Sequence, residues 1–356
     1  MRHPTIALNE NPIAWRWQRW GQQFRIPTED REELHSTHAV REILAHRSEE
    51  ASGQDAQIGL PSFLLKEGVP LFTPRVVHSS LPLLVHYYIT GDSKMKLTAN
   101  GIDIHYTIEG EGPVVTMSHA LGCDLSLWNE QAQALRVRYR VLRYDTRGHG
   151  QTSAPPGSYS LEQMTDDLYG LLTGLGVRQT HFAGISMGGM IGQIFALKYP
   201  MLLQGLILCS TTSRYPAAMR STWVERIRTV EAKGMEPTVE PALQRWFTPS
   251  FRERRPDVMD RVRVMLRRTP PHGYVGCCYA IPTIDVTDRL GEVRCPALVI
   301  AGEDDPGTPV AMAREIHAAI PSSEIAILRS ASHLCNLEQP EAFNRILLDF
   351  LDKATG

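Results

Sequence analysis

The sequence of 356 residues predicts an α/β fold with a mostly parallel sheet, and three observations support this prediction. Short apolar segments typical of buried strands alternate with helical segments from Pro113 onward. An alternating segment with an Asn100-Gly101 turn comes before them and is typical of a β-hairpin. A glycine-rich turn around Ser186 joins an apolar strand to a helix. Together these features predict an eight-stranded sheet that is covered by helices.

The elements of this sheet can be placed in chain order. The opening hairpin begins at Met95, and six further strands are expected at residues 113–119, 140–145, 180–185, 204–210, 297–302 and 324–329. Because parallel strands need long crossover connections, the intervening segments should be helices. Helical patterns occur at residues 126–136, 160–175, 187–199, 310–319 and 340–353.

Residues 211–288 differ from this alternating pattern. They contain no apolar run typical of a buried strand, and short amphipathic helices are expected at 219–233 and 256–268. Because this segment lies between two core strands, we expect it to form a helical cap over Ser186. The core domain then consists of residues 95–210 and 289–356.

Residues 1–94 carry three closely spaced tryptophans, Trp15, Trp17 and Trp20, and one expected helix at 31–47, but no functional motif. Two accounts of this segment stay open. It is either an accessory segment or upstream sequence translated from a misassigned start codon. We favour the second account, because the residues from Met95 onward already supply a complete fold.

Composition excludes several classes of function. A net charge of -2 gives no reason to expect a nucleic acid or an anionic membrane as partner. The six cysteines show no C-x-x-C spacing, so neither a zinc site nor a disulfide framework is predicted. The N-terminus lacks the features of a signal peptide, and the apolar run Leu81 to Thr90 is too short to span a bilayer. We expect a cytoplasmic protein that acts on a small molecule; its oligomeric state stays open.

Ser186 lies in a Gly-x-Ser-x-Gly frame that Gly184 and Gly188 complete. This frame is the nucleophile elbow of the α/β-hydrolase fold, in which a strand turns sharply into a helix and lifts the serine Oγ above the sheet. Only hydrogen fits as a side chain at the two flanking positions, which explains both glycines. Gly189 should let the helix pack closely. The frame predicts Ser186 as a nucleophile.

A serine hydroxyl needs a base, and the base needs an acid that orients it. In this fold the chain order is serine, acid, histidine. Three acids, Glu303, Asp304 and Asp305, end one core strand, and His333 follows the next strand. Parallel strands end at the same edge of the sheet, where Ser186 also lies. We predict Asp305 as the acid and His333 as the base, whereas Glu303 and Asp304 should cap a turn or face solvent.

The oxyanion of an acyl transfer needs two backbone N–H donors. One donor is expected at Met187, which directly follows the nucleophile, and the other at Leu121 in the loop 119–122. Another polar turn, residues 145–150, could supply a second catalytic group. We expect it to be structural, with Asp145 and Arg147 joining neighbouring loops.

From Met95 onward, the chain resembles the 3-oxoadipate enol-lactone hydrolases of the α/β-hydrolase superfamily. The resemblance implies a triad of Ser186, Asp305 and His333, a lactone as substrate, an acyl-enzyme intermediate, and no metal or cofactor. It also implies substrate contacts by Trp223 and Trp246 in the cap, and a place in aromatic catabolism. The segments that carry it are LGCDLSLW (121–128), YRVLRYDTRGHG (139–150), AGISMGGMIGQ (183–193), RWFTPSF (245–251), GYVGCC (273–278) and SHLCNLEQPEAF (332–343).

One departure bears on the substrate. Members of this family often carry an arginine soon after the cysteines of the cap, where this chain has Ile281-Pro282. Either another cap arginine, such as Arg214 or Arg220, holds a substrate carboxylate, or the substrate is a less charged lactone or ester. Two other functions stay open: a different serine esterase or lactonase with the same triad, and a non-catalytic ligand-binding protein with this fold.

Overall fold

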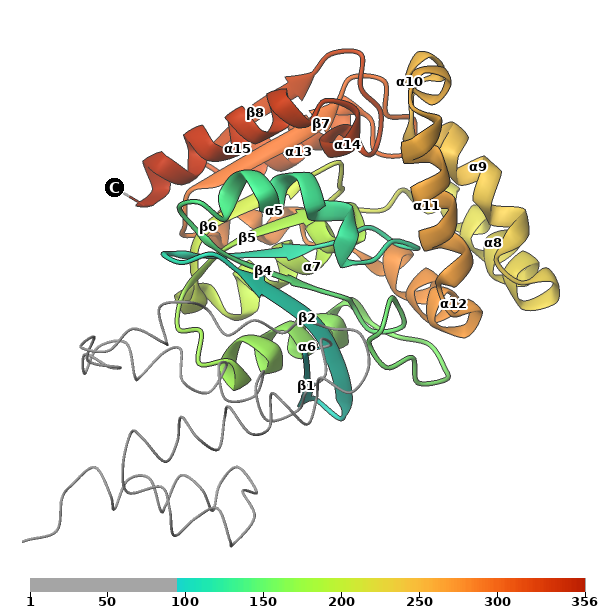
Figure 1. Cartoon of the computed structure of the whole chain (residues 1–356), viewed down its shortest axis with the longest axis horizontal. Helices are drawn as coiled ribbons and strands as arrows, with labels where there is room; N and C mark the ends of the chain where they lie inside the picture. The colour runs from blue at the N-terminus through green and yellow to red at the C-terminus, as the bar shows by residue number, and fades with distance from the viewer. Residues whose placement is uncertain (1–94, 356) are drawn as a thin grey trace, which may run out of the picture. The chain divides into compact units, whose positions relative to one another are not determined.

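The structure, a computed structural model, describes residues 95–355 (Figure 1). The extension 1–94 and the helix expected within it lie outside the described residues. The described part is built on one eight-stranded sheet in the order β1-β2-β4-β3-β5-β6-β7-β8, which confirms the predicted fold class. The strands are β1 (Met95–Ala99), β2 (Ile102–Glu109), β3 (Val114–Ser118), β4 (Arg140–Tyr144), β5 (Thr180–Ile185), β6 (Leu203–Cys209), β7 (Ala297–Gly302) and β8 (Ser323–Leu328).

The sheet is antiparallel at one edge and parallel elsewhere. β1 and β2 pair as a hairpin, and β2 pairs antiparallel with β4. Asn100 and Gly101 form the hairpin turn with φ of 48° and 76°, the left-handed conformation that asparagine and glycine adopt most readily. All pairs from β4 to β8 are parallel, so the carboxyl ends of β3, β5, β6, β7 and β8 share one edge.

Helices cover both faces of the sheet. α6 packs on α7, which lies against β5 and β6, whereas α15 packs with α5 and against β6 and β8. α7 is buried from Met187 to Ala196, as expected for a central helix between the sheet and α6. The helices of the core are η3 (Leu125–Trp128), α5 (Asn129–Leu135), α6 (Leu161–Gly174), α7 (Met187–Lys198), η4 (Pro200–Leu202), α13 (Val310–Ala319), α14 (Cys335–Glu338) and α15 (Pro340–Thr355).

The cap between β6 and β7 is helical, and its helices gather at one end of the sheet (Figure 1). The two cap helices expected from periodicity are present as α8 and α11. Within residues 95–355, none of the helices combines the length and apolar character that a membrane span requires. The helices of this segment are η5 (Ala217–Met219), α8 (Arg220–Lys233), α9 (Glu236–Trp246), α10 (Pro249–Arg254), α11 (Pro256–Arg268), α12 (Pro271–Ala280), η6 (Ile281–Thr283) and η7 (Thr287–Glu292).

Candidate active site

Ser186 occupies the sharp turn between β5 and α7. Its backbone has φ 57° and ψ -116°, a conformation that is costly for any residue except glycine. Hydrogen bonds hold it on both sides, because the Ser186 N–H donates to the Cys209 carbonyl at 2.9 Å and the Thr211 hydroxyl donates to the Ser186 carbonyl at 2.8 Å. The end of β6 therefore fixes the strained position of this serine.

The flanking glycines leave no room for a Cβ atom. A Cβ at Gly184 would lie 2.2 Å from the Gly188 carbonyl oxygen, and one at Gly188 would lie 2.3 Å from the Ser118 carbonyl oxygen. At Gly189 the nearest atom would be the Thr211 Cβ, at 2.7 Å. Gly189 thus allows a close approach to the residue after β6, and the elbow requires glycine at all three positions.

Asp305 and His333 form a direct pair. The Asp305 Oδ2 lies 2.7 Å from the His333 Nδ1, and both residues are buried. The other carboxylate oxygen accepts the N–H groups of Gly307 at 2.8 Å and Thr308 at 3.1 Å, and the Thr308 hydroxyl donates to Oδ2 at 2.6 Å. The carboxylate is therefore fixed from three sides, with His333 on the fourth.

The environment of Asp305 keeps it ionised. Burial acts to raise the pKa of this carboxyl, but the charge and hydrogen bond of His333 and the donors of Thr308 outweigh burial and hold the pKa below its usual value. Glu303 and Asp304 are exposed. Of the three acids that follow β7, the structure brings Asp305 to His333.

The loop that carries His333, residues 329–334, folds back over the end of β7. The Glu303 N–H donates to the Leu328 carbonyl and the Asp304 N–H to the Ala331 carbonyl, each at 2.9 Å. A Cβ at Gly302 would lie 2.1 Å from the Ser332 carbonyl oxygen. The absence of a side chain at Gly302 is what allows this loop to approach Asp305, a signal that the sequence analysis did not use.

The loop 119–122 lies at the same edge of the sheet. The Gly122 N–H donates to the His149 Nε2 at 2.9 Å, and the Cys123 N–H donates to the Ala120 carbonyl at 3.1 Å. The N–H of Leu121, the residue before Gly122, has no hydrogen-bond partner among residues 95–355. Met187 is the first residue of α7, where an N–H has no acceptor within the helix. Both positions expected to hold an oxyanion thus carry N–H groups free to donate.

Two buried histidines hold this loop. The His149 Nδ1 lies 3.2 Å from the Arg147 carbonyl, and the His119 Nδ1 lies 2.8 Å from the Ala120 carbonyl. The His119 Nε2 accepts the Thr146 N–H at 2.9 Å, as the His149 Nε2 accepts the Gly122 N–H. Each ring therefore donates from Nδ1, accepts at Nε2 and is neutral. Burial lowers the pKa of His149 to about 3 and also lowers that of His119.

Asp145 and Arg147 are joined to neighbouring loops. The Asp145 carboxylate contacts the His105 Nδ1 at 2.7 Å and accepts the backbone N–H groups of Leu125 and Gln151, each at 2.8 Å. Arg147 forms a two-bond pair with Asp167, at 2.8 Å through Nε and 2.6 Å through the second nitrogen. These contacts fit the structural role expected for the turn 145–150.

The two candidate substrate-binding tryptophans occupy different surroundings. The Trp246 ring stacks on the His333 ring, with centroids 6.3 Å apart and an angle of 25° between the planes. Trp223 is buried in the cap, where it meets the edge of Tyr215 at 5.8 Å and the guanidinium of Arg226 at 4.4 Å. Trp246 therefore lies beside the proposed base, whereas Trp223 belongs to a cluster between cap helices.

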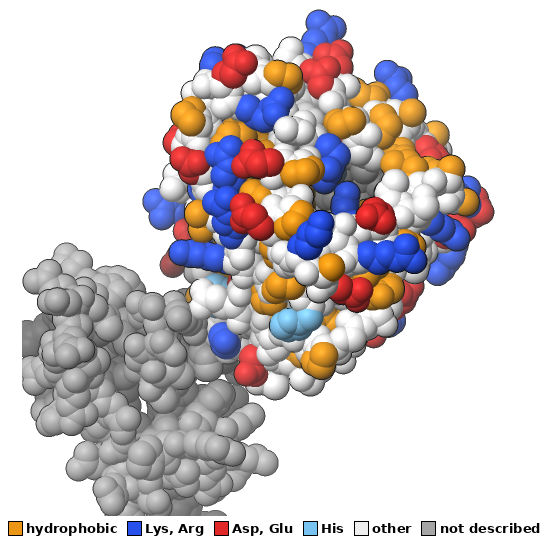
Figure 2. All heavy atoms as spheres, turned by 90° about the vertical axis from the view of Figure 1, so that its right-hand side faces the viewer, with side chains coloured by type: hydrophobic (Ala, Val, Ile, Leu, Met, Phe, Trp, Pro, Cys, Tyr) orange, Lys and Arg blue, Asp and Glu red, His pale blue; other side chains and the backbone are white. Residues whose placement is uncertain are grey.

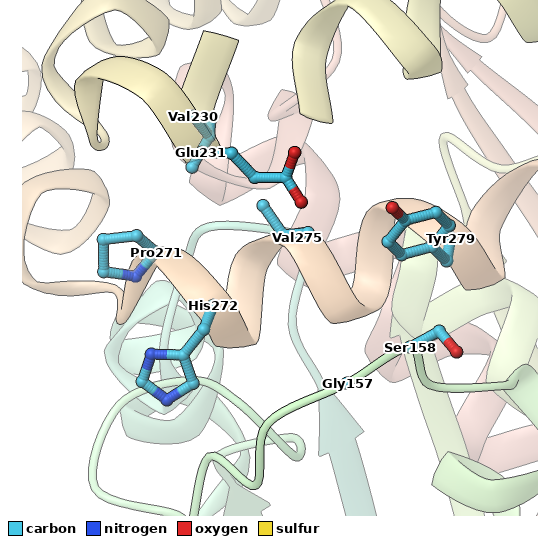
Figure 3. A pocket seen from close by; sticks show the side chains of 8 residues that line it. All are labelled: Gly157, Ser158, Val230, Glu231, Pro271, His272, Val275 and Tyr279. Atoms are coloured by element: carbon cyan, nitrogen blue, oxygen red, sulfur yellow. The ribbon is translucent and has the colours of Figure 1, made fainter. Parts of the chain in front are cut away.

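A surface hollow of about 630 Å³ lies between the loop after β4, α8 and α12. Figure 3 shows the exposed side chains of Glu231, His272 and Tyr279 around it. None of the predicted catalytic or oxyanion residues lines this hollow. Among residues 95–355, no group of three or more His, Cys, Asp or Glu side chains is arranged to hold a metal ion.

Comparison with known proteins places these features in a family. Residues 113–340 match the family model described as alpha/beta hydrolase fold. The chain is 37% identical over 253 residues to 3-oxoadipate enol-lactonase 2 of Acinetobacter baylyi, a match that covers 70% of this chain and 94% of the relative. It is 37% identical to the crystal structure of the enol-lactonase from Burkholderia xenovorans LB400, with a TM-score of 0.70 and coverage of 72% and 100%.

A thermophilic esterase from Thermogutta terrifontis, solved with malate bound, is 30% identical, with a TM-score of 0.71 and coverage of 74% of this chain and 99% of that one. The family model and the enol-lactonases together span the elbow, the cap and the loop of His333. The chain belongs to the 3-oxoadipate enol-lactonase family of α/β-hydrolases, and it is a hydrolase of the lactone and ester type.

Proposed function

We propose that this protein hydrolyses 3-oxoadipate enol-lactone to 3-oxoadipate, with Ser186 as nucleophile, His333 as base and Asp305 as the orienting acid. The observation that carries this proposal is the 2.7 Å contact between the Asp305 carboxylate and the His333 ring, at the edge of the sheet where the strained Ser186 follows β5. Similarity to enol-lactonases supports the choice of substrate.

The first half of the reaction forms an acyl-enzyme. Because Asp305 holds the His333 Nδ1–H, the Nε2 of the ring accepts the proton of the Ser186 hydroxyl. The Ser186 Oγ attacks the lactone carbonyl, and the N–H groups of Leu121 and Met187 stabilise the negative oxygen that forms. Collapse of this intermediate breaks the ring C–O bond and expels an enolate.

The second half releases the product. His333 returns its proton to the enolate, and the resulting enol tautomerises to a ketone, which makes ring opening effectively irreversible. A water molecule then gives a proton to His333 and attacks the acyl carbonyl, and Ser186 regains its proton as the acid leaves. Stacking against Trp246 holds the His333 ring in one plane through both proton transfers. The reaction belongs to aromatic catabolism by way of 3-oxoadipate.

A second candidate function is hydrolysis of a less charged lactone or ester. Arg214, one of the two arginines considered for the substrate carboxylate, is partly exposed and already paired with Asp285 at 2.6 Å and Asp288 at 2.7 Å. The similarity to an esterase also favours this alternative. The two functions share the triad and differ only in what the cap recognises.

The deciding measurement is kcat/KM of the purified protein for 3-oxoadipate enol-lactone beside an uncharged lactone of similar ring size. We expect preference for the charged substrate. A preference of about tenfold or more for the uncharged lactone, roughly 1.4 kcal/mol in transition-state binding, would reject the specific substrate and favour the second candidate. Labelling with a fluorophosphonate, with Ser186→Ala as control, tests Ser186 as the nucleophile: no labelling of the native protein would reject the acyl-enzyme mechanism.

A further inference from the structure

Two cap arginines, Arg226 on α8 and Arg245 on α9, are half-buried and have no carboxylate within ion-pair distance among residues 95–355. Elsewhere the surface of the cap mixes Lys and Arg with Asp and Glu (Figure 2). Among residues 95–355, Arg220, Arg228, Arg252, Arg254 and Arg268 also lack a carboxylate within ion-pair distance, whereas five other cap arginines have acidic partners. These pairs are Arg214 with Asp285 and Asp288, Arg255 with Asp257, Arg261 with Glu130, Arg263 with Glu240 and Asp260, and Arg267 with Glu236.

The guanidinium groups of Arg226 and Arg245 interact electrostatically with each other and with the Tyr274 phenol, which is also hydrogen-bonded to Arg226. Burial, and then the charge of Arg226, lower the pKa of Arg245. Burial raises the pKa of Tyr274 to about 12, and Arg226 and Arg245 both act against this rise. Two partly desolvated cations side by side repel each other, and an anion placed between them relieves that cost. The cluster therefore favours a negatively charged ligand.

This cluster is connected to both halves of the catalytic centre. The Tyr274 ring would lie 3.3 Å from a Cβ at Gly122, directly after Leu121. Arg245 precedes Trp246, whose ring stacks on His333. The Ser332 hydroxyl donates to the Arg245 carbonyl at 2.9 Å, and the Leu334 N–H donates to the Trp246 carbonyl at 3.1 Å. The end of α9 is thus fixed to the His333 loop, and Tyr274 connects the arginines with the oxyanion loop.

Trp223 holds one arginine without neutralising it. The Arg226 guanidinium carbon lies 4.4 Å from the centroid of the Trp223 ring, a cation–π contact that restrains the side chain and leaves its full charge. The Trp223 Nε1–H is buried and has no hydrogen-bond partner among the described residues. Buried N–H donors are nearly always paired, so this donor is available to a polar ligand.

We propose that Arg226 and Arg245, with the Tyr274 hydroxyl and the Trp223 N–H, bind the free carboxylate of the substrate. This inference rests on the proposed function and deepens it. It assigns the carboxylate to residues other than Arg214 and Arg220. A guanidinium pair offers planar donors to both carboxylate oxygens, and it discriminates against neutral analogues that leave these donors unpaired.

The test compares Arg226→Gln and Arg245→Gln with a matched control, Arg228→Gln, which removes an exposed arginine from the same helix as Arg226. The first readout is the ratio of kcat/KM for 3-oxoadipate enol-lactone to kcat/KM for p-nitrophenyl acetate, which is uncharged. We expect this ratio to fall by about tenfold or more in the first two variants, because each removes one charge-assisted contact to the carboxylate. The control should keep the native ratio.

The second readout does not depend on the enol-lactone. Adipate should inhibit p-nitrophenyl acetate hydrolysis competitively in the native protein, with an inhibition constant about tenfold higher in Arg226→Gln and Arg245→Gln and unchanged in Arg228→Gln. Arg226→Lys and Arg245→Lys should recover part of the affinity, because they retain the charge and lose the planar fork. Equal thermal midpoints establish that the variants are folded.

The two proposals fail in different ways. If the native protein opens the enol-lactone and the glutamine variants keep the native ratio and the native inhibition constant, the carboxylate site is wrong and the proposed function stands. If the native protein does not open the enol-lactone but adipate inhibition weakens in both glutamine variants, the function is wrong and the anion site stands. An equal effect of Arg228→Gln would reject the site, since overall charge would then explain the result.

Discussion

Glu338 joins the catalytic core to the cap through Thr248. One oxygen of its carboxylate accepts both the backbone N–H of Thr248 at 2.7 Å and the Thr248 hydroxyl at 2.8 Å, and the other accepts the N–H of Ser332. Thr248 precedes α10, and Ser332 precedes His333. Burial raises the pKa of Glu338, and these donors act in the opposite direction. One buried carboxylate therefore sets the position of the His333 loop relative to the cap.

Replacement of Glu338 by glutamine should lower both stability and activity. The amide keeps one acceptor oxygen and places an N–H₂ group against a backbone N–H, so one buried donor loses its partner at a cost of about 1–3 kcal/mol. For a domain of this size, the thermal midpoint should fall by roughly 2–4 °C per kcal/mol. Glu341→Gln, an exposed site three residues on, is the matched control. Calorimetry measures the thermal midpoint, and steady-state kinetics measure kcat/KM. Equal values of both for Glu338→Gln and Glu341→Gln would contradict this positioning role.

Ser186→Ala should abolish hydrolysis and leave the protein folded. Loss of a triad member typically lowers kcat on the order of a millionfold. Alanine also relieves none of the backbone strain at this position, because its φ of 57° is set by the neighbouring contacts. Steady-state hydrolysis and circular dichroism check the two halves of the prediction. Residual activity above a few per cent would identify a different nucleophile.

The neighbouring acids offer a matched pair of variants. Asp305→Asn should lower kcat about ten-thousandfold, because the amide can donate to the His333 Nδ1 and stabilise the wrong tautomer. Asp304→Asn changes an exposed side chain directly before it and should have little effect. Kinetics of both variants under the same conditions test the assignment. The opposite order of effects would move the acid to Asp304.

Sequence patterns predicted the parts of this fold that depend on local signals. Glycines around Ser186 and the turn at Asn100-Gly101 mark backbone conformations that few other residues adopt, and α8 and α11 follow regular apolar spacing. Three further cap helices were not placed from the sequence. α9 contains an internal proline, Pro241, α10 spans only six residues, and the pattern of α12 is interrupted by Gly273 and Gly276. Packing against other helices stabilises such segments more than their intrinsic preference does.

The candidate site likewise contains residues that the sequence could identify and residues that it could not. Chain order pointed to His333 and to the three acids after β7, because parallel strands end at one edge. The contact between Asp305 and His333 is what distinguishes Asp305 from Glu303 and Asp304.

Proximity in the chain to Trp223 suggested Arg214 and Arg220 for the substrate carboxylate, although Arg226 lies as near to Trp223 as Arg220 does. The site that we propose combines Arg226 with Arg245, which comes from a different helix. Side chains on different cap helices come together only when the cap folds, and no regular spacing in the sequence indicates which of them will meet.

His149 makes the loop 119–122 sensitive to acid. Its pKa is about 3 in the folded protein and about 6.5 for an unperturbed histidine. Between these pH values the unfolded chain binds a proton that the folded protein does not. The free energy of unfolding is therefore highest above pH 6.5, and it declines as the pH falls toward 3 by about 1.4 kcal/mol per pH unit for this group. Protonation would also remove the acceptor for the Gly122 N–H.

His149→Gln should make this decline shallower. Glutamine does not titrate, and its carbonyl can still accept the Gly122 N–H, so between pH 6 and pH 4 the variant should lose about 1.4 kcal/mol per pH unit less than the native protein. Urea unfolding at a series of pH values measures this slope. His272→Gln removes an exposed histidine and should keep the native slope. Parallel curves for native protein and His149→Gln would mean that the ring is protonated in the folded state, which contradicts its acceptor role beside Leu121.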